Sequence, residues 1–403
     1  MLSILLITTD FPFGDSETSF LETEYEVLKK NANVCVLAIT KSTGTTKLKN
    51  IYKFEDYRPS LLTAIKQFSY KEIRKDIFLA SKHTSFFCWL KRIRDIIAYS
   101  AHAEHVQSFI KEIVDAHNIN IVYTYWCTPA TLAALRIKES CNIPVITRFH
   151  GYDLYRERTK SNWQPLRYYI SGNIDKMYFV CKRGMEYYTN LYGYPRKCDV
   201  AYLGTKKRKF LGVPDRKNEI VLLSCSSVIP LKRVELIAKT VYELSKKIKV
   251  KWYHIGGPIK SFKILDEANI KYNMLGQVPN EKIDEIYEKV KPDLFITLSS
   301  TEGSPISIQE AFSMGIPAIG TDVGGIPELI IENETGYTIS MNANPIIVSD
   351  KIIKHMQLQY RDKIRISHNA YMLWENQCNA EKNAEMFLKK VISIKICAKR
   401  SID

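Results

Sequence analysis

Two glutamates, Glu302 and Glu310, lie on either side of a predicted helix start. The apolar residues 294–298 predict a buried strand just before them. Ser304 is a favourable N-cap and Pro305 suits the first helical position, so a helix is expected to begin there. The pattern therefore places one acid in the loop before the helix and the other on its second turn.

The start of this helix is a predicted anion site. Its first N–H groups, near Ile306 and Ser307, have no acceptor within the helix, and the helix dipole adds positive potential that favours phosphate. In a parallel sheet such a loop lies at the carboxyl edge, where α/β proteins bind their ligands. Glu302 could accept hydrogen bonds from sugar hydroxyls, and Glu310 could reach the vicinal hydroxyls of a ribose. The alternative is that both are surface acids that the helix dipole favours.

Residues 301–317 resemble the E-x7-E signature of glycosyltransferase family 4, a family with the two-domain GT-B fold. The resemblance continues through residues 321–328 and 333–337 and covers most of residues 220–338. It implies that Glu302 and the backbone after it hold the donor sugar and that Glu310 holds the ribose. The donor-binding residues after Glu302 would be Gly303, Ser304, Pro305, Ile306 and Ser307.

Residues 224–233 resemble the phosphate-binding loop of the same family, in which an arginine and a lysine bind the donor diphosphate. Lys232 stands at the lysine position, whereas Ser227 stands at the arginine position. Departure of the leaving group needs positive charge where the charge of the diphosphate develops. Arg233 stands where the family usually has glycine, and it could replace the missing arginine or point outward.

Three further segments resemble parts of the family's site. Residues 148–153 resemble its histidine motif, which implies that His150 faces the donor sugar and the acceptor. Gly14, in the first strand-to-helix turn, resembles a glycine loop that meets the donor phosphates or the acceptor. Val278 stands in a segment that resembles the loop at the edge of the donor base. Glu17 and Glu22, close to Gly14 in the sequence, are expected to be surface or capping acids.

The rest of the chain alternates short apolar strands with helical stretches, which is typical of parallel α/β sheets. One series begins with the strand at residues 3–8 and another near residue 219. We expect a GT-B fold, with two Rossmann-like domains that face each other across a cleft and a C-terminal helix that crosses back to the first domain. The predicted parts are an acceptor-binding domain at residues 1–203, a nucleotide-sugar-binding domain at 204–375, and the final helix at 376–403.

The net charge of +15 favours a negatively charged partner. Basic and aromatic residues are interleaved between residues 66 and 94, in a segment expected to be mostly helical. This segment could lie on an anionic membrane surface, or it could form a helical hairpin with a solvated basic face. Nucleic acid is not expected as a partner, because no nucleic-acid-binding motif accompanies the charge.

The nine cysteines are scattered and none forms a C-x-x-C pair, which favours a reducing cytosol over a disulfide framework or a zinc site. Residues 2–7 lack a basic leader and predict a strand rather than a signal peptide. No apolar run reaches transmembrane length. We therefore expect a cytoplasmic protein, peripheral to the inner face of the cell membrane if the basic segment binds lipid.

Together these features predict a retaining glycosyltransferase of the hexosyltransferase type. It would move a sugar from a nucleotide-diphosphate sugar to a polysaccharide or lipid-linked oligosaccharide acceptor in cell-surface glycan synthesis. The expected catalytic residues are Glu302, His150 and Lys232. No metal or other cofactor is expected, since no D-x-D-type carboxylate pair ends a strand.

Two other functions remain compatible with the sequence. A sugar-nucleotide epimerase shares the GT-B architecture and would bind the same donor, although it should need more acid and base groups. A non-catalytic scaffold descended from a transferase would explain the serine at position 227. A dehydrogenase is disfavoured, because no G-x-G-x-x-G opens a helix after the first strand.

Overall fold

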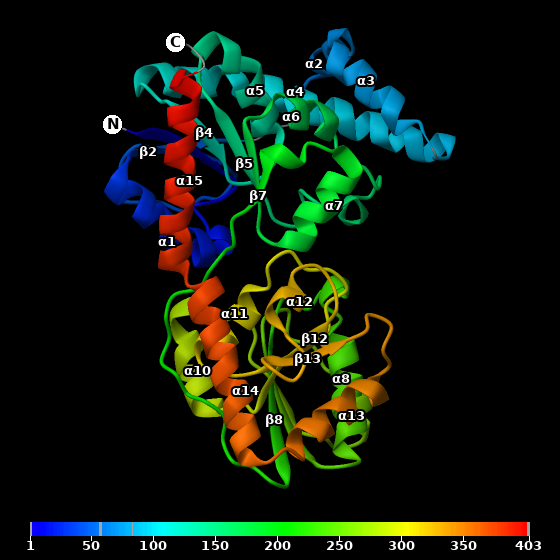
Figure 1. Ribbon diagram of the computed structural model, residues 1–403. Coiled ribbons are helices and arrows are strands. Elements are labelled where there is room, and N and C mark those ends of the chain that lie inside the picture. Colours follow the sequence, from blue (N-terminus) through cyan, green and yellow to red (C-terminus); the bar gives the residue numbers. More distant parts are fainter. Residues whose placement is uncertain (1, 56–58, 83, 401–403) are drawn as a thin grey trace. The chain divides into compact units, whose positions relative to one another are not determined.

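The structure is a computed structural model that describes residues 2–55, 59–82 and 84–400, and it divides into two compact units (Figure 1). The first contains Met1–Ala201 and Glu381–Asp403, and the second contains Tyr202–Ala380. Each has a parallel sheet accompanied by helices, so the predicted α/β class is confirmed. Met1 and residues 401–403, which the predicted domains include, lie outside the described residues.

The first unit has a parallel sheet with strand order β3-β2-β1-β4-β5-β6-β7 within the described residues. Its strands are β1 Ser3–Thr8, β2 Asn33–Ile39, β3 Ile51–Phe54, β4 Ile121–Thr124, β5 Val145–Phe149, β6 Lys176–Phe179 and β7 Cys198–Val200. Its helices are α1 Asp15–Asn31, α2 Leu61–Lys66, α3 Lys71–Ala80, α4 Phe86–Ala116, α5 Pro129–Cys141, α6 Arg167–Asn173, α7 Lys182–Tyr192 and nearly all of α15 Ala380–Arg400.

The second unit has a parallel sheet with strand order β10-β9-β8-β11-β12-β13 in the described part of the chain. Its strands are β8 Glu219–Cys225, β9 Lys249–Ile255, β10 Tyr272–Met274, β11 Leu294–Thr297, β12 Ala318–Thr321 and β13 Gly336–Ile339. Its helices are α8 Val234–Ser245, α9 Lys263–Glu267, α10 Ile283–Val290, α11 Ile306–Ser313, α12 Ile326–Leu329, α13 Pro345–Met356 and α14 Tyr360–Leu373.

Both sheets reverse their strand order at one point. The first three strands of each sheet run outward from one central strand, and the fourth returns to pair with the other side of that strand. The central pairs are β1 with β4 and β8 with β11. Ligands of open α/β sheets bind outside the carboxyl ends of the strands at such a reversal. The loops after β1, β4, β8 and β11 are therefore the places to look for a site.

Three short strands without a long apolar run lie at sheet edges. They are β3, β7 and β13, which end their sheets and are three or four residues long. An edge strand is covered and paired on one side only, so it needs no long apolar run. The central strands, by contrast, are almost fully buried, as in Ser3–Thr8 of β1, and their apolar runs made them visible in the sequence.

The final helix packs on the first unit. In Figure 1, α15 is drawn in red beside β4 and β5, and the ring of Phe387 lies 5.0 Å from the ring of Tyr123 on β4. The Arg148 guanidinium on β5 lies 4.2 Å from the centre of the Phe387 ring. Lys390 donates to the carboxylate of Asp199 on β7 at 2.7 Å. The ring of Phe387 also lies 5.0 Å from that of Tyr178 on β6, so the helix contacts β4, β5, β6 and β7.

A buried ion pair lies beneath this helix. Arg148 is fully buried, and its Nη1 donates to Oε2 of Glu24 on α1 at 2.6 Å. The other carboxylate oxygen of Glu24 accepts a hydrogen bond from the Tyr123 hydroxyl at 3.1 Å. Breaking a buried pair leaves an uncompensated charge, which costs far more than an exposed pair contributes.

We expect Glu24→Ala to reduce the free energy of unfolding by about 3–5 kcal/mol, because it leaves the buried charge of Arg148 without its carboxylate partner. Asp115→Ala, which removes an exposed partner of Lys111 on α4, is the matched control and should change little. Urea unfolding followed by circular dichroism measures both. Equal effects of the two substitutions would show that Glu24 does not stabilise the buried arginine.

Candidate functional site

The strand reversal of the second unit brings two predicted residues together. Lys232 ends a short 3-10 turn after β8, and Glu302 lies in the loop after β11. Lys232 Nζ donates to Glu302 Oε1 at 2.5 Å, and Glu302 is 8% exposed. The loops are also joined by their backbones, since the N–H of Ser300 donates to the carbonyl of Leu231 at 2.9 Å. A lysine and a carboxylate therefore face each other at the carboxyl edge of this sheet.

The loop after β12 packs against Glu302. Gly324 has φ +50°, and a Cβ added there would lie 1.7 Å from the carbonyl oxygen of Glu302. Only glycine allows both this left-handed conformation and this approach of the two backbones. Gly324 therefore fixes the position of the Glu302 backbone. The sequence did not predict this role for Gly324.

The predicted helix start is present, one residue later than expected. α11 begins at Ile306, and its N-cap is Pro305, which has an extended conformation and makes no side-chain cap. Ser304, the predicted N-cap, instead accepts a hydrogen bond from Nε2 of Gln309 at 2.7 Å. Gly303 and Pro305, which follow Glu302 in this loop, are also buried. The first N–H groups of α11, at Ile306 and Ser307, follow directly.

Glu310 has a cationic partner that the sequence did not reveal. Arg208 Nη2 donates to Glu310 Oε1 at 2.9 Å, and both side chains are less than a tenth exposed. The same guanidinium also pairs with Asp284 and donates to Asn280 Oδ1 at 3.1 Å. Burial raises the pKa of Glu310, while Arg208 acts in the opposite direction. Arg208 lies in a run of four basic residues, 206–209, near the start of the second unit.

The charges of Lys232 and Arg208 both act on the Cys225 thiol. Burial raises the pKa of the Cys225 thiol, at the end of β8, to about 12, and the charge of Glu310 adds to this rise. Lys232 and Arg208 both lower it. Because electrostatic effects of this kind require proximity, Lys232, Arg208 and Glu310 all lie near the carboxyl end of β8.

Three other predicted donor residues have no contact with the Lys232–Glu302 pair among the hydrogen bonds and ion pairs of the described residues. Ser227 is exposed. Arg233 has a left-handed backbone, and its guanidinium donates to the carbonyl of Met341 in the loop after β13 at 2.9 Å. Val278 is half-buried against the apolar cluster around Phe295 and Phe312. Of the two possibilities for Arg233, the structure shows the side chain bound to a neighbouring loop.

His150 lies in the first unit, directly after β5, and it is 5% exposed. Its ring is 4.0 Å from the ring of Trp126 and 4.6 Å from that of Tyr125. Neither ring nitrogen has a hydrogen-bond partner in the described part of the chain. Burial, and then the charge of Arg148, holds the pKa of His150 well below its ordinary value, so the imidazole is neutral at pH 7. A neutral imidazole can both donate and accept a hydrogen bond.

Hydrogen bonds with the side chains of Asp153 and Arg167 hold the loop that carries His150 in place. Asp153 Oδ1 accepts from the backbone N–H of His150 at 3.0 Å and of Gly151 at 3.1 Å, and Oδ2 accepts from the N–H of Cys127 at 3.0 Å. Arg167 donates to the carbonyls of Cys127 and Asp153, at 2.9 Å each. These contacts tie the loops after β4 and β5 together and fix the backbone at His150.

The expectation for Glu17 was incomplete. Glu17 is 1% exposed rather than a surface acid, and it caps the turn after β1, because its carboxylate accepts from the N–H groups of Asp10 at 2.7 Å and Phe11 at 2.8 Å. It also accepts from the indole N–H of Trp126, which packs on His150. Glu22 is exposed, as expected.

Gly14 lies in the same turn, next to the carboxylate of Asp10. A Cβ added at Gly14 would lie 1.8 Å from Oδ2 of Asp10, so this carboxylate covers the glycine. A carboxylate accepts hydrogen bonds from hydroxyls and repels phosphate.

Within residues 2–55, 59–82 and 84–400, no three His, Cys, Asp or Glu side chains are grouped so that they could hold a metal ion. The same part of the chain has no helix long and apolar enough to cross a membrane.

Comparison with known proteins identifies the second unit. Residues 206–372 match the family model described as "Glycosyl transferases group 1". This match covers nearly all of the unit that holds Lys232, Glu302, Glu310 and Arg208.

Individual relatives extend the similarity over the whole chain. TuaC of Bacillus subtilis, which is named as a teichuronic acid biosynthesis glycosyltransferase, is 24% identical over 95% of this chain and 96% of its own. The structure of Anabaena Alr3699/HepE in complex with UDP has a TM-score of 0.69 and 14% identity, and the match covers 98% of this chain and 100% of that one. Sucrose-phosphate synthase from Thermosynechococcus elongatus has a TM-score of 0.73 at 11% identity, with the same coverage. These structures share the GT-B fold, so the predicted fold class, with two Rossmann-like domains, is confirmed.

We expect Gly324→Ala to destabilise the second unit by more than about 1 kcal/mol, since alanine is strained at positive φ and its Cβ would displace the Glu302 carbonyl. Gly276→Ala is the control, because Gly276 also has positive φ but a Cβ there would meet only the end of the Ile259 side chain, at 3.3 Å. Thermal unfolding measures both. If Gly324→Ala costs no more than Gly276→Ala, the loop after β12 does not constrain Glu302.

Proposed function

We propose that this chain, a group 1 glycosyltransferase, moves a sugar from a nucleoside-diphosphate donor to a glycan or lipid-linked acceptor in cell-surface glycan synthesis. The observation that carries the proposal is the Lys232–Glu302 pair at the reversal of the second sheet, directly before the start of α11. The named role of TuaC supports the acceptor class, and the UDP and UDP-glucose complexes of HepE support a uridine diphosphate sugar as the first donor to test.

The pair has the two groups that such a donor needs. The ammonium of Lys232 can bind the diphosphate, and the carboxylate of Glu302 can accept from the sugar hydroxyls. Each group neutralises the other while the donor is absent, which avoids an unpaired charge in a buried loop. In the donor complex, Lys232 would exchange the Glu302 carboxylate for the diphosphate, and the sugar hydroxyls would take its place on Glu302.

Arg208 supplies a second positive charge in this proposal. The phosphate-binding loop has Ser227 where related enzymes have arginine, and Arg233 binds the Met341 carbonyl instead. Arg208 lies near the end of β8 together with Lys232. It holds one oxygen of Glu310, whose other oxygen can accept from a ribose hydroxyl.

The proposed reaction retains the configuration of the transferred sugar. The acceptor oxygen forms a bond to the anomeric carbon on the face from which the diphosphate leaves, while the bond between that carbon and the diphosphate oxygen breaks. The acceptor proton passes to the departing phosphate oxygen, so the products are the glycoside and the nucleoside diphosphate. The residues of this chain would position the donor and stabilise the developing negative charge, and His150 would orient the sugar or the acceptor. None of these steps requires a metal ion or another cofactor.

We expect Lys232→Ala, Glu302→Ala and Arg208→Ala each to lower turnover by about 10²–10³-fold, the effect of removing one preorganised electrostatic contact. Arg233→Ala is the matched control and should leave turnover within a few-fold of the native enzyme. Release of UDP, GDP or ADP from a panel of their sugars, with and without added glycan acceptors, measures turnover. Circular dichroism checks the fold of each variant.

The assay separates the alternatives. Native turnover in Lys232→Ala and Glu302→Ala would overturn the proposed donor site. Isomerised donor without an acceptor would indicate an epimerase, and no nucleotide release from any donor would favour a scaffold. A loss in Arg233→Ala equal to that in Arg208→Ala would reverse the roles of the two arginines.

A membrane surface is the proposed location of the acceptor. Large apolar side chains project from α2, α3 and the start of α4, a surface that we name the apolar-basic face. Its members, with their exposed fractions, are Leu62 79%, Ile65 58%, Phe68 47%, Phe78 64%, Phe86 63%, Phe87 78% and Leu90 44%. Its cations are the exposed residues Lys66, Arg74, Lys82, Lys91 and Arg94. Exposed apolar side chains among cations are the combination that binds anionic lipid surfaces.

We expect the protein to bind vesicles of phosphatidylglycerol and phosphatidylcholine but not vesicles of phosphatidylcholine alone. The double substitution Leu62→Glu with Phe87→Glu should weaken this binding about tenfold or more, because it replaces inserted apolar area by charges that anionic lipid repels. Ile346→Glu with Ile347→Glu, two exposed residues of α13, is the control. Equal sedimentation of both variants with the vesicles would exclude the apolar-basic face as the contact.

A further inference from the structure

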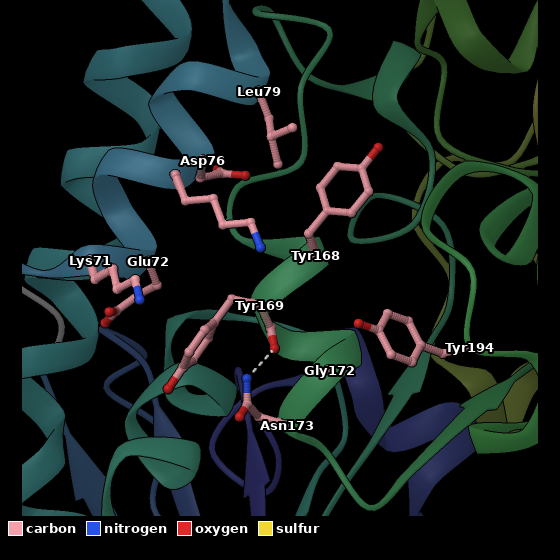
Figure 2. Close-up of a pocket in the computed structure, with 10 residues that line it drawn as sticks. Lys71, Glu72, Asp76, Leu79, Tyr168, Tyr169, Gly172, Asn173 and Tyr194 are labelled. Carbon is pink, nitrogen blue, oxygen red and sulfur yellow. Dashed lines mark hydrogen bonds between the residues drawn. The ribbon is translucent and has the colours of Figure 1, made fainter.

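A cavity of about 290 Å³ lies between α3 and α6 in the first unit, outside every residue discussed for the donor and for His150 (Figure 2). One wall is formed by α3, with Lys71, Glu72 and Asp76. The other is formed by α6, with Tyr168 and Tyr169. The volume is at the lower end of the range of small-molecule sites, roughly 300–1,000 Å³, and suits one sugar-sized ring.

Asp76 gives the cavity a buried acceptor without a donor. The residue is 3% exposed, and its Oδ2 accepts from Nε1 of Trp163 at 3.2 Å and from the N–H of Leu166 at 2.9 Å. Its Oδ1 has no hydrogen-bond partner among the described residues. A buried oxygen without a donor is unfavourable, so a ligand hydroxyl that donates to it would be bound strongly. Figure 2 shows Asp76 on the wall that faces α6.

The rim of the cavity is positively charged. Lys71 and Lys75 lie one turn apart on α3, and both are exposed. At the other end, Lys197 donates to the carbonyl of Gly172 at 2.6 Å and lies over the ring of Tyr194. Burial, and then the charge of Lys138, lowers the pKa of Lys197, while Asp175 acts in the opposite direction. An anionic group on the ligand would offset the positive charge of the rim.

The α6 wall is aromatic. Tyr168 and Tyr169 are half-buried, and Tyr194, also in the lining, is 44% exposed. The hydroxyl of Tyr168 donates to the carbonyl of Leu191 at 3.1 Å, which fixes its ring. Fixed aromatic rings with one apolar face and a wet edge suit a ligand that is itself apolar on one face and hydroxylated at its rim.

We propose that this cavity binds an acidic sugar unit, that is, a pyranose that carries a carboxylate or a phosphate. The anionic group would lie between Lys71 and Lys75, the ring against the tyrosines, and one hydroxyl would donate to Oδ1 of Asp76. As a role in catalysis, this rests on the proposed transfer to a glycan. The cavity would then hold a unit of an acidic acceptor chain away from the bond that forms.

The position of the cavity agrees with this role. Gly172 and Asn173 end α6, shortly before β6 begins at Lys176, so this end of the cavity lies toward the amino edge of the sheet. His150 follows β5 and therefore lies at the carboxyl edge. This end of the cavity and His150 are at opposite edges of one parallel sheet. A single sugar cannot occupy both, whereas a chain of several units can.

Titration calorimetry with the purified full-length protein tests the proposal, with glucuronate, glucose 6-phosphate, glucose and inorganic phosphate as probes. We expect both acidic sugars to bind more tightly than glucose by about tenfold or more, and phosphate alone to bind more weakly than either. Lys71→Ala with Lys75→Ala should remove this preference for the acidic sugars. The matched control is Lys29→Ala with Lys30→Ala, which removes two exposed lysines of α1 outside the lining.

Asp76→Asn separates binding from folding. The amide oxygen of asparagine can still accept from Leu166 and Trp163, and its NH₂ group replaces the free acceptor by a donor. We expect an unchanged melting temperature and about tenfold weaker binding of glucuronate and glucose alike. Unchanged binding in Asp76→Asn or in the Lys71 and Lys75 double variant would overturn the proposal, as would glucose binding as tightly as glucuronate or phosphate binding as tightly as the sugars.

Failure of the donor site and failure of this cavity are distinguishable. Lys232→Ala should lose thermal stabilisation by UDP and keep glucuronate binding, whereas the Lys71 and Lys75 double variant should show the reverse. Loss of glucuronate binding in Lys232→Ala would place the acidic sugar at the donor site and reject the cavity.

Discussion

The reversal of strand order in the second sheet is the constraint on which the candidate site depends. β8 and β11 are neighbours in space but are separated in sequence by β9, β10 and their connections. Only this order brings the loop that ends at Lys232 beside the loop that carries Glu302, 70 positions later. Without this strand order, Lys232 and Glu302 would not form their ion pair, and Lys232 would not lie near the loop that precedes α11. The chemistry is therefore a consequence of topology first and of residue type second.

Buried and half-buried ion pairs occur in both units, at two kinds of location. Arg148 and Glu24 neutralise each other deep in the first unit, where no ligand is needed to satisfy them. Lys232 with Glu302, and Arg208 with Glu310, lie instead at the carboxyl edge of a sheet. Such pairs can exchange partners, because a diphosphate and sugar hydroxyls offer the same types of contact. The first kind of pair stabilises the fold, and in the proposed donor complex the second kind would be replaced by contacts with the donor.

How much the sequence could predict depends on the distance over which the information extends. The central strands were predictable from their apolar runs, and Glu302 and Lys232 from local spacing and resemblance. Arg208 was not, since its partner Glu310 is 102 positions away and a run of basic residues looks like a solvated loop. Pro305 replaced Ser304 as N-cap because Gln309 binds the serine hydroxyl. Glu17 was expected to be a surface or capping acid; it is buried, and its carboxylate caps the N–H groups of the turn after β1.

Helix α3 shows how one short element serves three surroundings in the first unit. Ile73, Asp76 and Ala80 recur at helical spacing and point into the unit. Lys71 and Lys75 lie at the rim of the cavity, and Phe78 projects from the apolar-basic face. The positive charge of this segment is thus not a uniform solvated face, because part of it borders a cavity with a buried carboxylate. An acidic glycan on a lipid carrier would offer negative charge to both surfaces of the same helix, so its lipid end and its sugar end could bind side by side.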